Sequence, residues 1–159
     1  MSGVLFVCLG NICRSPAGEG ILRHHIQQEP ALKDVRIESC GMGDWHIGHL
    51  PDERMRNASS QRGVHLSSIA QRFKPSFFEE FDYILAADHD VLNDLYRHAK
   101  TPEHRAKVHL ITHFSTLYKD EEVPDPYYGG EAGFELVLDM LEDSCQGLIH
   151  QLLEQKGKK

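Results

Sequence analysis

The chain has 159 residues, of which 40% are apolar and 26% are charged, and its formal net charge is -7 at pH 7. That length suits one domain with a substantial buried core, and the acidic balance argues against an extended nucleic-acid footprint. The N-terminal sequence MSGVLFVCLG lacks a basic region and soon reaches the polar Asn11, so it is typical neither of a signal peptide nor of a membrane span. We therefore expect one cytoplasmic domain over 1–159, with no nucleic-acid or membrane partner.

The predicted elements alternate between strand and helix. In chain order they are a strand over 4–7, a helix after the first-turn residue Pro16, a strand over 35–39, a helix within 51–63, a strand over 82–87, a helix over 88–99, a strand over 108–111 and a C-terminal helix with an apolar stripe from Phe134 to Leu152. This order predicts an α/β fold, a single-domain open four-stranded parallel sheet flanked by helices. Such sheets bind ligands beyond the carboxyl ends of their strands, and Cys8 lies at that end of the first strand.

The loop after the first strand combines the features of an anion site. A loop that enters a helix presents unpaired N–H groups and the positive end of the helix dipole. Gly10 and Asn11 both tolerate the left-handed backbone region, which allows close backbone approach to a ligand, and Arg14 adds a planar guanidinium that grips two phosphate oxygens. We therefore predict that the phosphate-binding loop consists of Leu9, Gly10, Asn11, Ile12, Cys13, Arg14 and Ser15.

Cys8 is the candidate nucleophile at the base of this loop. The same donors favour its thiolate form, and Ser15 can donate a hydroxyl to the sulfur. A thiolate beneath a bound phosphate is the arrangement for in-line phosphoryl transfer to sulfur, which forms a phosphocysteine. That chemistry requires no cofactor, and the 11 histidines show no HExxH or paired Cys-His spacing. We expect no metal site.

Several motifs resemble one family. Cys8, Arg14 and Ser15 fit the Cys-x5-Arg-Ser signature of protein tyrosine phosphatases, and CLGNICRSP resembles the low-molecular-weight family in particular. GDWHIG (43–48) is similar to the family's Trp-bearing substrate loop, DYILAAD (82–88) to its third strand and VPDPYYGG (123–130) to its general-acid loop, in family order across nearly the full length. The resemblance implies the same parallel fold and the hydrolysis of phosphotyrosine in protein substrates and of small aryl phosphates, with inorganic phosphate as product.

The resemblance also implies catalytic roles. It makes Cys8 the nucleophile, Arg14 the clamp on phosphate and transition state, and Asp125 the proton donor. The chemistry independently requires such a donor, because tyrosinate is a poor leaving group, and the resulting carboxylate can activate water against the phosphocysteine. Asp125 between two prolines would by itself be interpreted as a turn residue. Together with the Cys8 loop, however, Asp125 is interpreted as the proton donor.

The predicted substrate cleft has aromatic walls. The resemblance assigns these walls to Trp45, Tyr127 and Tyr128, although Trp45 would also suit a core position. Asp88 matches a family aspartate that orients the arginine, and it would equally suit the cap of the helix that follows. These two interpretations of Asp88 predict different contacts.

The other three cysteines are not expected to act as nucleophiles toward phosphate. Cys13 is either a small packed residue or the partner of Cys8 in a reversible disulfide that spares the nucleophile from overoxidation. Cys40 and Cys145 are expected to be buried apolar residues.

One position departs from the family pattern. Many relatives have a histidine where this chain has Ser68, and that histidine supports the loop asparagine. Here the support of Asn11 would fall to His65 or to a water. Catalysis should survive, because neither the nucleophile nor the acid is altered.

Three other functions share some of these sequence features. An arsenate reductase of the same fold needs further cysteines to relay a disulfide, and DYILAADHDV (82–91) contains none. A protein-arginine phosphatase has a threonine in place of Ile12, and isoleucine favours an aromatic substrate. A non-catalytic phosphotyrosine-binding module would need neither Cys8 nor Asp125. The sequence therefore predicts a protein tyrosine phosphatase that is a monomer or a weak homodimer.

Overall fold

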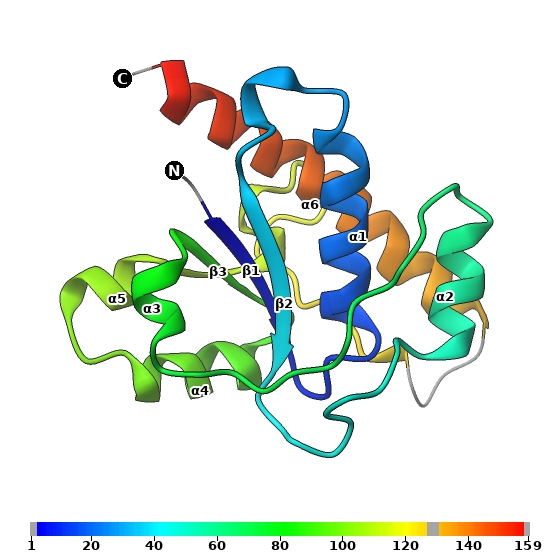
Figure 1. The fold of residues 1–159 in the computed structure, drawn as a ribbon, viewed down its shortest axis with the longest axis horizontal. Coiled ribbons are helices and arrows are strands. Elements are labelled where there is room, and N and C mark those ends of the chain that lie inside the picture. Colours follow the sequence, from blue (N-terminus) through cyan, green and yellow to red (C-terminus); the bar gives the residue numbers. More distant parts are fainter. Residues whose placement is uncertain (1–2, 127–130, 158–159) are drawn as a thin grey trace.

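The computed structural model describes residues 3–126 and 131–157, and it contains one parallel sheet between two helical layers (Figure 1). The elements in chain order are β1 (Gly3–Cys8), α1 (Arg14–Ile26), η1 (Pro30–Leu32), β2 (Arg36–Gly41), α2 (Glu53–Ser60), α3 (Phe77–Glu80), β3 (Tyr83–Ala86), α4 (His89–His98), α5 (Pro102–Ala106), β4 (Val108–Leu110), η2 (Ile111–Phe114) and α6 (Glu131–Gly157). The strand order is β2-β1-β3-β4, and each neighbouring pair is parallel. The predicted fold class is confirmed.

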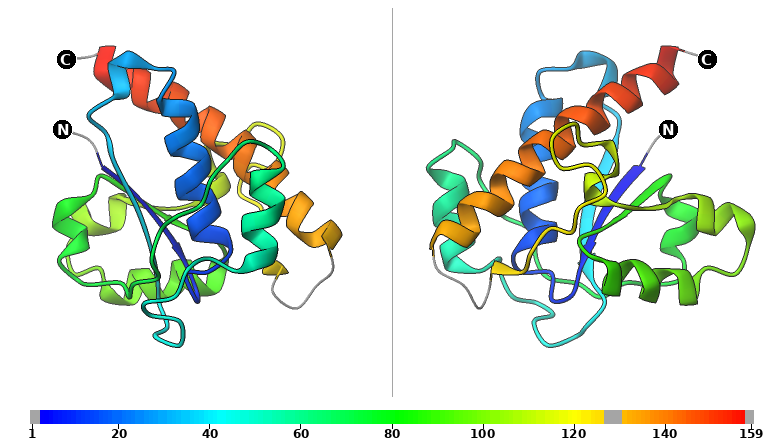
Figure 2. Two further views of the ribbon diagram at one scale, coloured as in Figure 1. Left: turned by 45° about the vertical axis from the view of Figure 1, so that its right-hand side comes forward. Right: turned by 180° about the vertical axis from the view of Figure 1, so that it is seen from behind.

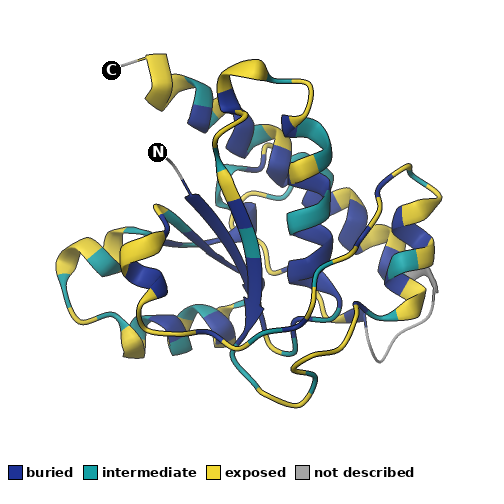
Figure 3. Cartoon of the chain, in the orientation of Figure 1, coloured by how far each residue is buried: buried dark blue, intermediate teal, exposed yellow. Residues whose placement is uncertain are grey.

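The central strand β1 is buried along its whole length. Its side chains alternate between the two faces of the sheet. Val4 and Phe6 belong to the core beneath α1 and α6, whereas Leu5 and Val7 belong to the core beneath α3 and α4. A continuous apolar run is what a strand covered on both faces requires. Figure 3 shows the same pattern, with buried strands and exposed outer helix surfaces.

Helices α1 and α6 cover one face of the sheet (Figure 2). The predicted apolar stripe of α6, from Phe134 to Leu152, is buried against this core. The helix also packs on η2, where Gly147 lies against the backbone of Phe114. A Cβ at Gly147 would lie 1.7 Å from the Phe114 carbonyl oxygen, so the approach requires a glycine.

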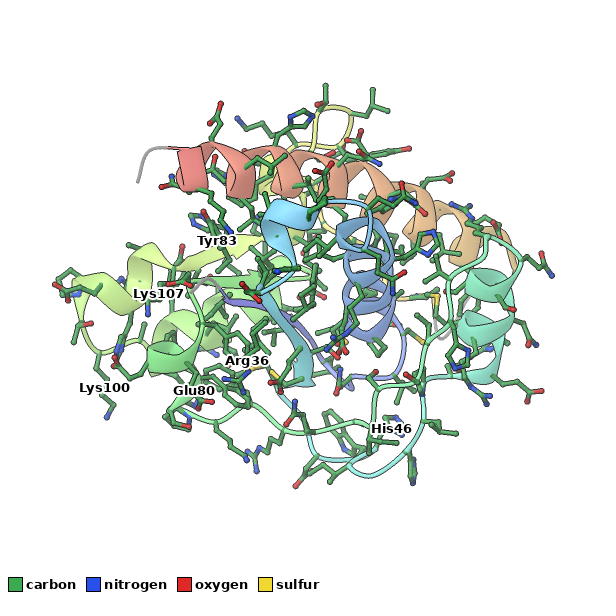
Figure 4. The ribbon with its side chains drawn as sticks, turned by 45° about the horizontal axis from the view of Figure 1, so that its top comes forward. Arg36, His46, Glu80, Tyr83, Lys100 and Lys107 are labelled. Atoms are coloured by element: carbon green, nitrogen blue, oxygen red, sulfur yellow. The ribbon has the colours of Figure 1, made fainter. Side chains whose placement is uncertain are left out.

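Helices α3, α4 and α5 cover the opposite face, and α3 is also tied to the edge strand β2. Arg36 at the start of β2 lies beside Glu80 at the end of α3 (Figure 4), with 3.1 Å between Nη1 and Oε1. The guanidinium of Arg36 also lies 4.5 Å from the centroid of the Phe81 ring. Helices α3 and α5 were not predicted, because four or five residues are too few to show a helical period.

The carboxyl ends of β1, β2 and β3 lie together at the lower edge of the sheet in Figure 1. The loops that follow them carry most of the predicted functional residues, as expected for an open parallel sheet. None of the helices in the described part of the chain has both the length and the apolar character of a membrane span.

Candidate active site

The loop between β1 and α1 encloses the sulfur of Cys8. The backbone N–H of Asn11 donates to Cys8 Sγ at 3.3 Å, and Ser15 Oγ lies 2.9 Å from the same sulfur. Asn11 has a φ of 58°, so it uses the left-handed region that the sequence allowed. Gly10 lies close to His46, since a Cβ at position 10 would lie 3.1 Å from the His46 ring and would require that side chain to shift. The loop therefore presents hydrogen-bond donors to the sulfur.

The side chain of Asn11 is fixed by three hydrogen bonds. Its Nδ2 donates to Ser15 Oγ at 2.7 Å and to Ser39 Oγ at 3.0 Å. Its Oδ1 accepts from the backbone N–H of Gln71 at 2.9 Å. His65 is exposed and is not among these partners, so its expected role as a support is wrong. Ser39, on β2, takes that role, and local sequence gave no signal for it.

Arg14 is 3% exposed and is held from three sides. Its Nη1 donates to Asp88 Oδ2 at 2.6 Å and to the Val123 carbonyl oxygen at 3.0 Å. Its Nη2 lies 3.7 Å from Asp125 Oδ2. Burial by itself would lower the pKa of Arg14, but the negative charges of Cys8, Asp88 and Asp125 outweigh it and raise the pKa above its ordinary value. The guanidinium is therefore both charged and fixed in direction.

Asp88 has both of its predicted roles. While Oδ2 binds Arg14, Oδ1 accepts from the backbone N–H of Val91 at 2.9 Å and caps α4. The Val123 segment is anchored next to it, because the Val123 N–H donates to the Ala87 carbonyl oxygen at 2.8 Å. Two segments far apart in the sequence thus meet at Arg14.

Cys8, Arg14 and Asp125 line one cavity of about 490 Å³. Trp45 also lines it and is 65% exposed, which supports its prediction as a wall rather than a core residue. The complete lining consists of Cys8, Leu9, Gly10, Ile12, Cys13, Arg14, Trp45, His46 and Asp125. Tyr127 and Tyr128, the other predicted walls, lie outside the described residues.

His46 lines the cavity but was missed in the sequence. Figure 4 places it on the loop between β2 and α2. Its position directly after Trp45 in GDWHIG was the available signal.

All four cysteines are free and buried. Burial, together with the negative charges of Asp52 and Cys8, raises the pKa of the Cys13 thiol. Burial also raises the pKa values of Cys40 and Cys145, so these three side chains are thiols at neutral pH. Within residues 3–126 and 131–157, no three His, Cys, Asp or Glu side chains are grouped to hold a metal ion.

Comparison with known proteins gives the family. The family described as low molecular weight phosphotyrosine protein phosphatase matches residues 3–158. The chain belongs to this family. A fission yeast (Schizosaccharomyces pombe) phosphatase of that name is 40% identical to the chain over 152 residues, which are 94% of this chain and 96% of the yeast protein. The protein is therefore an enzyme of the protein-tyrosine-phosphatase class, and its substrates are phosphoproteins.

Solved structures of phosphatases share the fold of this chain. A protein tyrosine phosphatase from Entamoeba histolytica has a TM-score of 0.92 and 42% sequence identity to the phosphatase, covering 98% of this chain and 99% of its own. A Drosophila arginine phosphatase is also similar, with a TM-score of 0.87 and 31% identity over 96% of this chain and 98% of its own.

Proposed function

We propose that this tyrosine phosphatase acts through a phosphocysteine intermediate, with Cys8 as nucleophile, Arg14 as phosphate clamp and Asp125 as general acid. The observation that carries the proposal is that a thiol, a fixed guanidinium and a partly exposed carboxyl group line one cavity. These are the three groups that transfer of a phosphoryl group from an aryl oxygen requires. The single domain over 1–159, the cytoplasmic location and the monomer or weak homodimer stay predictions.

In the first step, the loop N–H groups and Arg14 bind the phosphate oxygens. The Cys8 sulfur attacks phosphorus in line with the tyrosine oxygen, so an S–P bond forms as the P–O bond breaks. Asp125 gives its proton to the departing phenolate oxygen. Arg14 stabilises the charge that gathers on the transferring oxygens, because its guanidinium is held in place before the substrate binds.

In the second step, Asp125 as a carboxylate removes a proton from water. The water oxygen attacks phosphorus, the S–P bond breaks and inorganic phosphate forms. Ser15 supports the departing sulfur. Its oxygen accepts from Asn11 Nδ2 at 2.7 Å, so its own proton is available for Cys8 Sγ at 2.9 Å or the Cys40 carbonyl oxygen at 3.3 Å. The shorter contact favours the sulfur.

The lining of the cavity supports phosphotyrosine over the alternatives. Ile12 and Trp45 present apolar surface to an aromatic ring, whereas an arginine phosphatase is expected to have threonine at position 12. A disulfide relay of the arsenate reductase kind would need a further cysteine at the cavity besides Cys8 and Cys13, but neither Cys40 nor Cys145 lines it. Binding alone would need neither a nucleophile nor an acid.

The test is to trap the intermediate. Rapid quenching of the enzyme with a labelled phosphotyrosine peptide should yield protein-bound phosphate. The stability of this label to acid and base should be that of an S–P bond. Cys8→Ser should abolish both the label and turnover but leave the binding of inorganic phosphate measurable, because the loop amides and Arg14 remain.

A phosphoarginine peptide of the same sequence serves as the substrate control, and wild type should hydrolyse it far more slowly. Appreciable turnover by Cys8→Ser would contradict the covalent mechanism. Equal rates on the two peptides would contradict the choice of substrate.

A further inference from the structure

A second cavity, of about 270 Å³, lies where β2 ends. We call it the basic groove, and it is lined by Met42, Arg72, Phe73, Lys74, Pro75 and His98. Phe73 is buried and gives the groove an apolar floor, whereas Arg72, Lys74 and His98 are exposed. The groove therefore combines apolar surface with two permanent positive charges.

The groove is held in shape by backbone pairing. The Gly41 N–H donates to the Gln71 carbonyl oxygen at 2.8 Å, and the Phe73 N–H donates to the Gly41 carbonyl oxygen at 2.8 Å. The Phe73 ring is packed edge-on against Phe78, with 5.4 Å between ring centroids. Arg72 thus projects from a segment that is fixed to the end of β2, and the site is formed before any ligand arrives.

The groove and the catalytic cavity share one segment of the chain. The Met42 N–H donates to the Cys8 carbonyl oxygen at 3.0 Å, and the Gly43 N–H donates to the Leu9 carbonyl oxygen at 2.9 Å. Met42 lines the groove, and Trp45 lines the catalytic cavity. Met42 and Trp45 are three residues apart, so their Cα atoms lie within about 11 Å of each other. We infer that residues two to four positions from a bound phosphotyrosine can reach the groove.

The charge of the groove opposes that of the molecule, whose net charge is -7. Arg72 lies 3.9 Å from Asp44, with side chains 61% and 65% exposed respectively. An ion pair so long and so exposed is weak, so a carboxylate on a ligand can take its place. Lys74 Nζ lies 5.9 Å from the Phe77 ring centroid.

We propose that the basic groove binds acidic residues that flank the phosphotyrosine of a protein substrate, and so sets sequence preference. This inference rests on the proposed function of the adjoining site. The substrate class is then a phosphotyrosine segment with Asp or Glu two to four residues from the phosphorylated position. Such a segment places its phosphate on the Cys8 loop and its carboxylates on Arg72 and Lys74.

The test compares paired phosphotyrosine peptides that carry Asp and Glu, or Asn and Gln, at those positions. Wild type should show the higher kcat/KM on the acidic peptide. Arg72→Ala/Lys74→Ala should lose about tenfold in kcat/KM on that peptide, about threefold for each exposed charge. It should keep wild-type rates on the amide peptide and on p-nitrophenyl phosphate. The loss should shrink at about 0.5 M salt, because salt screens exposed charges.

Lys33→Ala/Lys119→Ala is the matched control, because it removes the same charge from two exposed lysines outside the groove. It should retain the preference for the acidic peptide. Asp44→Asn should raise kcat/KM on the acidic peptide, because it removes the competing carboxylate.

Three results would overturn the proposal. The first two are no peptide preference in wild type, and equal losses on all three substrates in the groove variant. A third is binding to phosphatidylserine vesicles that the groove variant loses, with no peptide preference, since it would assign the groove to a membrane surface. A wild type that hydrolyses none of the substrates would contradict the proposed function instead, so the two failures are distinguishable.

Discussion

The proposed role of Asp125 as a general acid is supported by its place in the cavity rather than by its residue type. Asp125 lies in a proline-flanked segment that resembles an ordinary turn, yet its side chain is 37% exposed and lines the cavity, and its Oδ2 lies 3.7 Å from Arg14 Nη2. The loss of a proton donor slows the reaction more when the leaving oxygen is more basic. The role of Asp125 can therefore be tested by varying the substrate.

Asp125→Asn keeps the shape of the side chain and removes the proton. For phosphotyrosine, whose phenol has a pKa of about 10, the rate of phosphocysteine formation should fall by about 10²–10⁴-fold. For p-nitrophenyl phosphate, whose phenol is far more acidic, the same substitution should cost much less. Single-turnover burst measurements give both rates. Equal losses would make Asp125 a structural residue, and the acid would have to lie elsewhere.

Cys13 differs from Cys8 in environment although both line the same cavity. Burial raises the pKa of Cys13, so its reactive thiolate is scarce at neutral pH. After peroxide converts Cys8 to a sulfenic acid, closure of a Cys8–Cys13 disulfide should therefore be slow at pH 7. Its rate should rise about tenfold per pH unit as the thiolate fraction grows. Thiol counting after a peroxide pulse and catalase measures this rate.

The protective role of that disulfide is tested by Cys13→Ser. Recovery of activity with a dithiol should be poorer in the variant, because oxidised Cys8 then proceeds to irreversible acids. Equal recovery in both proteins would leave Cys13 as a packing residue only.

At the scale of elements, the N-cap residue of helix α4 connects the stability of the helix to the position of Arg14. Asp88 caps the helix with one carboxylate oxygen and binds Arg14 with the other. Asparagine is as good a cap as aspartate, but it lacks the charge. The two functions can therefore be separated by comparing two substitutions at one position.

We expect Asp88→Asn and Asp88→Ala to lose similar activity, about ten- to a hundredfold in kcat/KM, because Arg14 is misplaced in both. Asp88→Ala should in addition lower the free energy of unfolding by about 1 kcal/mol relative to Asp88→Asn, because only alanine removes the cap. Urea unfolding and steady-state kinetics measure the two effects. Full activity in Asp88→Asn would make the contact with Arg14 incidental, and equal stabilities would show that the cap does not contribute.

Elements with a long or continuous apolar pattern were predictable from the sequence, and very short helices were not. The apolar stripe on α6 spans many helical turns, so it predicts a helix. The apolar run of β1 is typical of a strand that is buried on both faces. Helix α3 has 4 residues and is held by Phe77 and Phe78 in the core, so its shape comes from tertiary packing rather than from periodicity.

At the scale of the whole molecule, the sequence predicted groups that lie in one loop better than groups that meet across the fold. Cys8, Arg14 and Ser15 were readable because their spacing is local. Ser39 was not, since it reaches Asn11 from another strand, and the Val123 carbonyl that binds Arg14 has no signature in a side chain. The sheet topology predicts which edge of the sheet carries the site, but not which backbone atoms meet there.

The partners of Arg14 also have a consequence for how the protein is made. Arg14 lies near the start of the chain, yet Asp88 and the Val123 carbonyl bind it from 74 and 109 residues further along. Contacts of such long sequence separation require closure of long loops and tend to form late in folding. A nascent chain on the ribosome therefore carries Cys8 and Arg14 from the outset, but Arg14 cannot be fixed until most of the protein has emerged. We therefore expect phosphatase activity to appear only once the sheet is complete, so that a growing chain would not remove phosphate before it has folded.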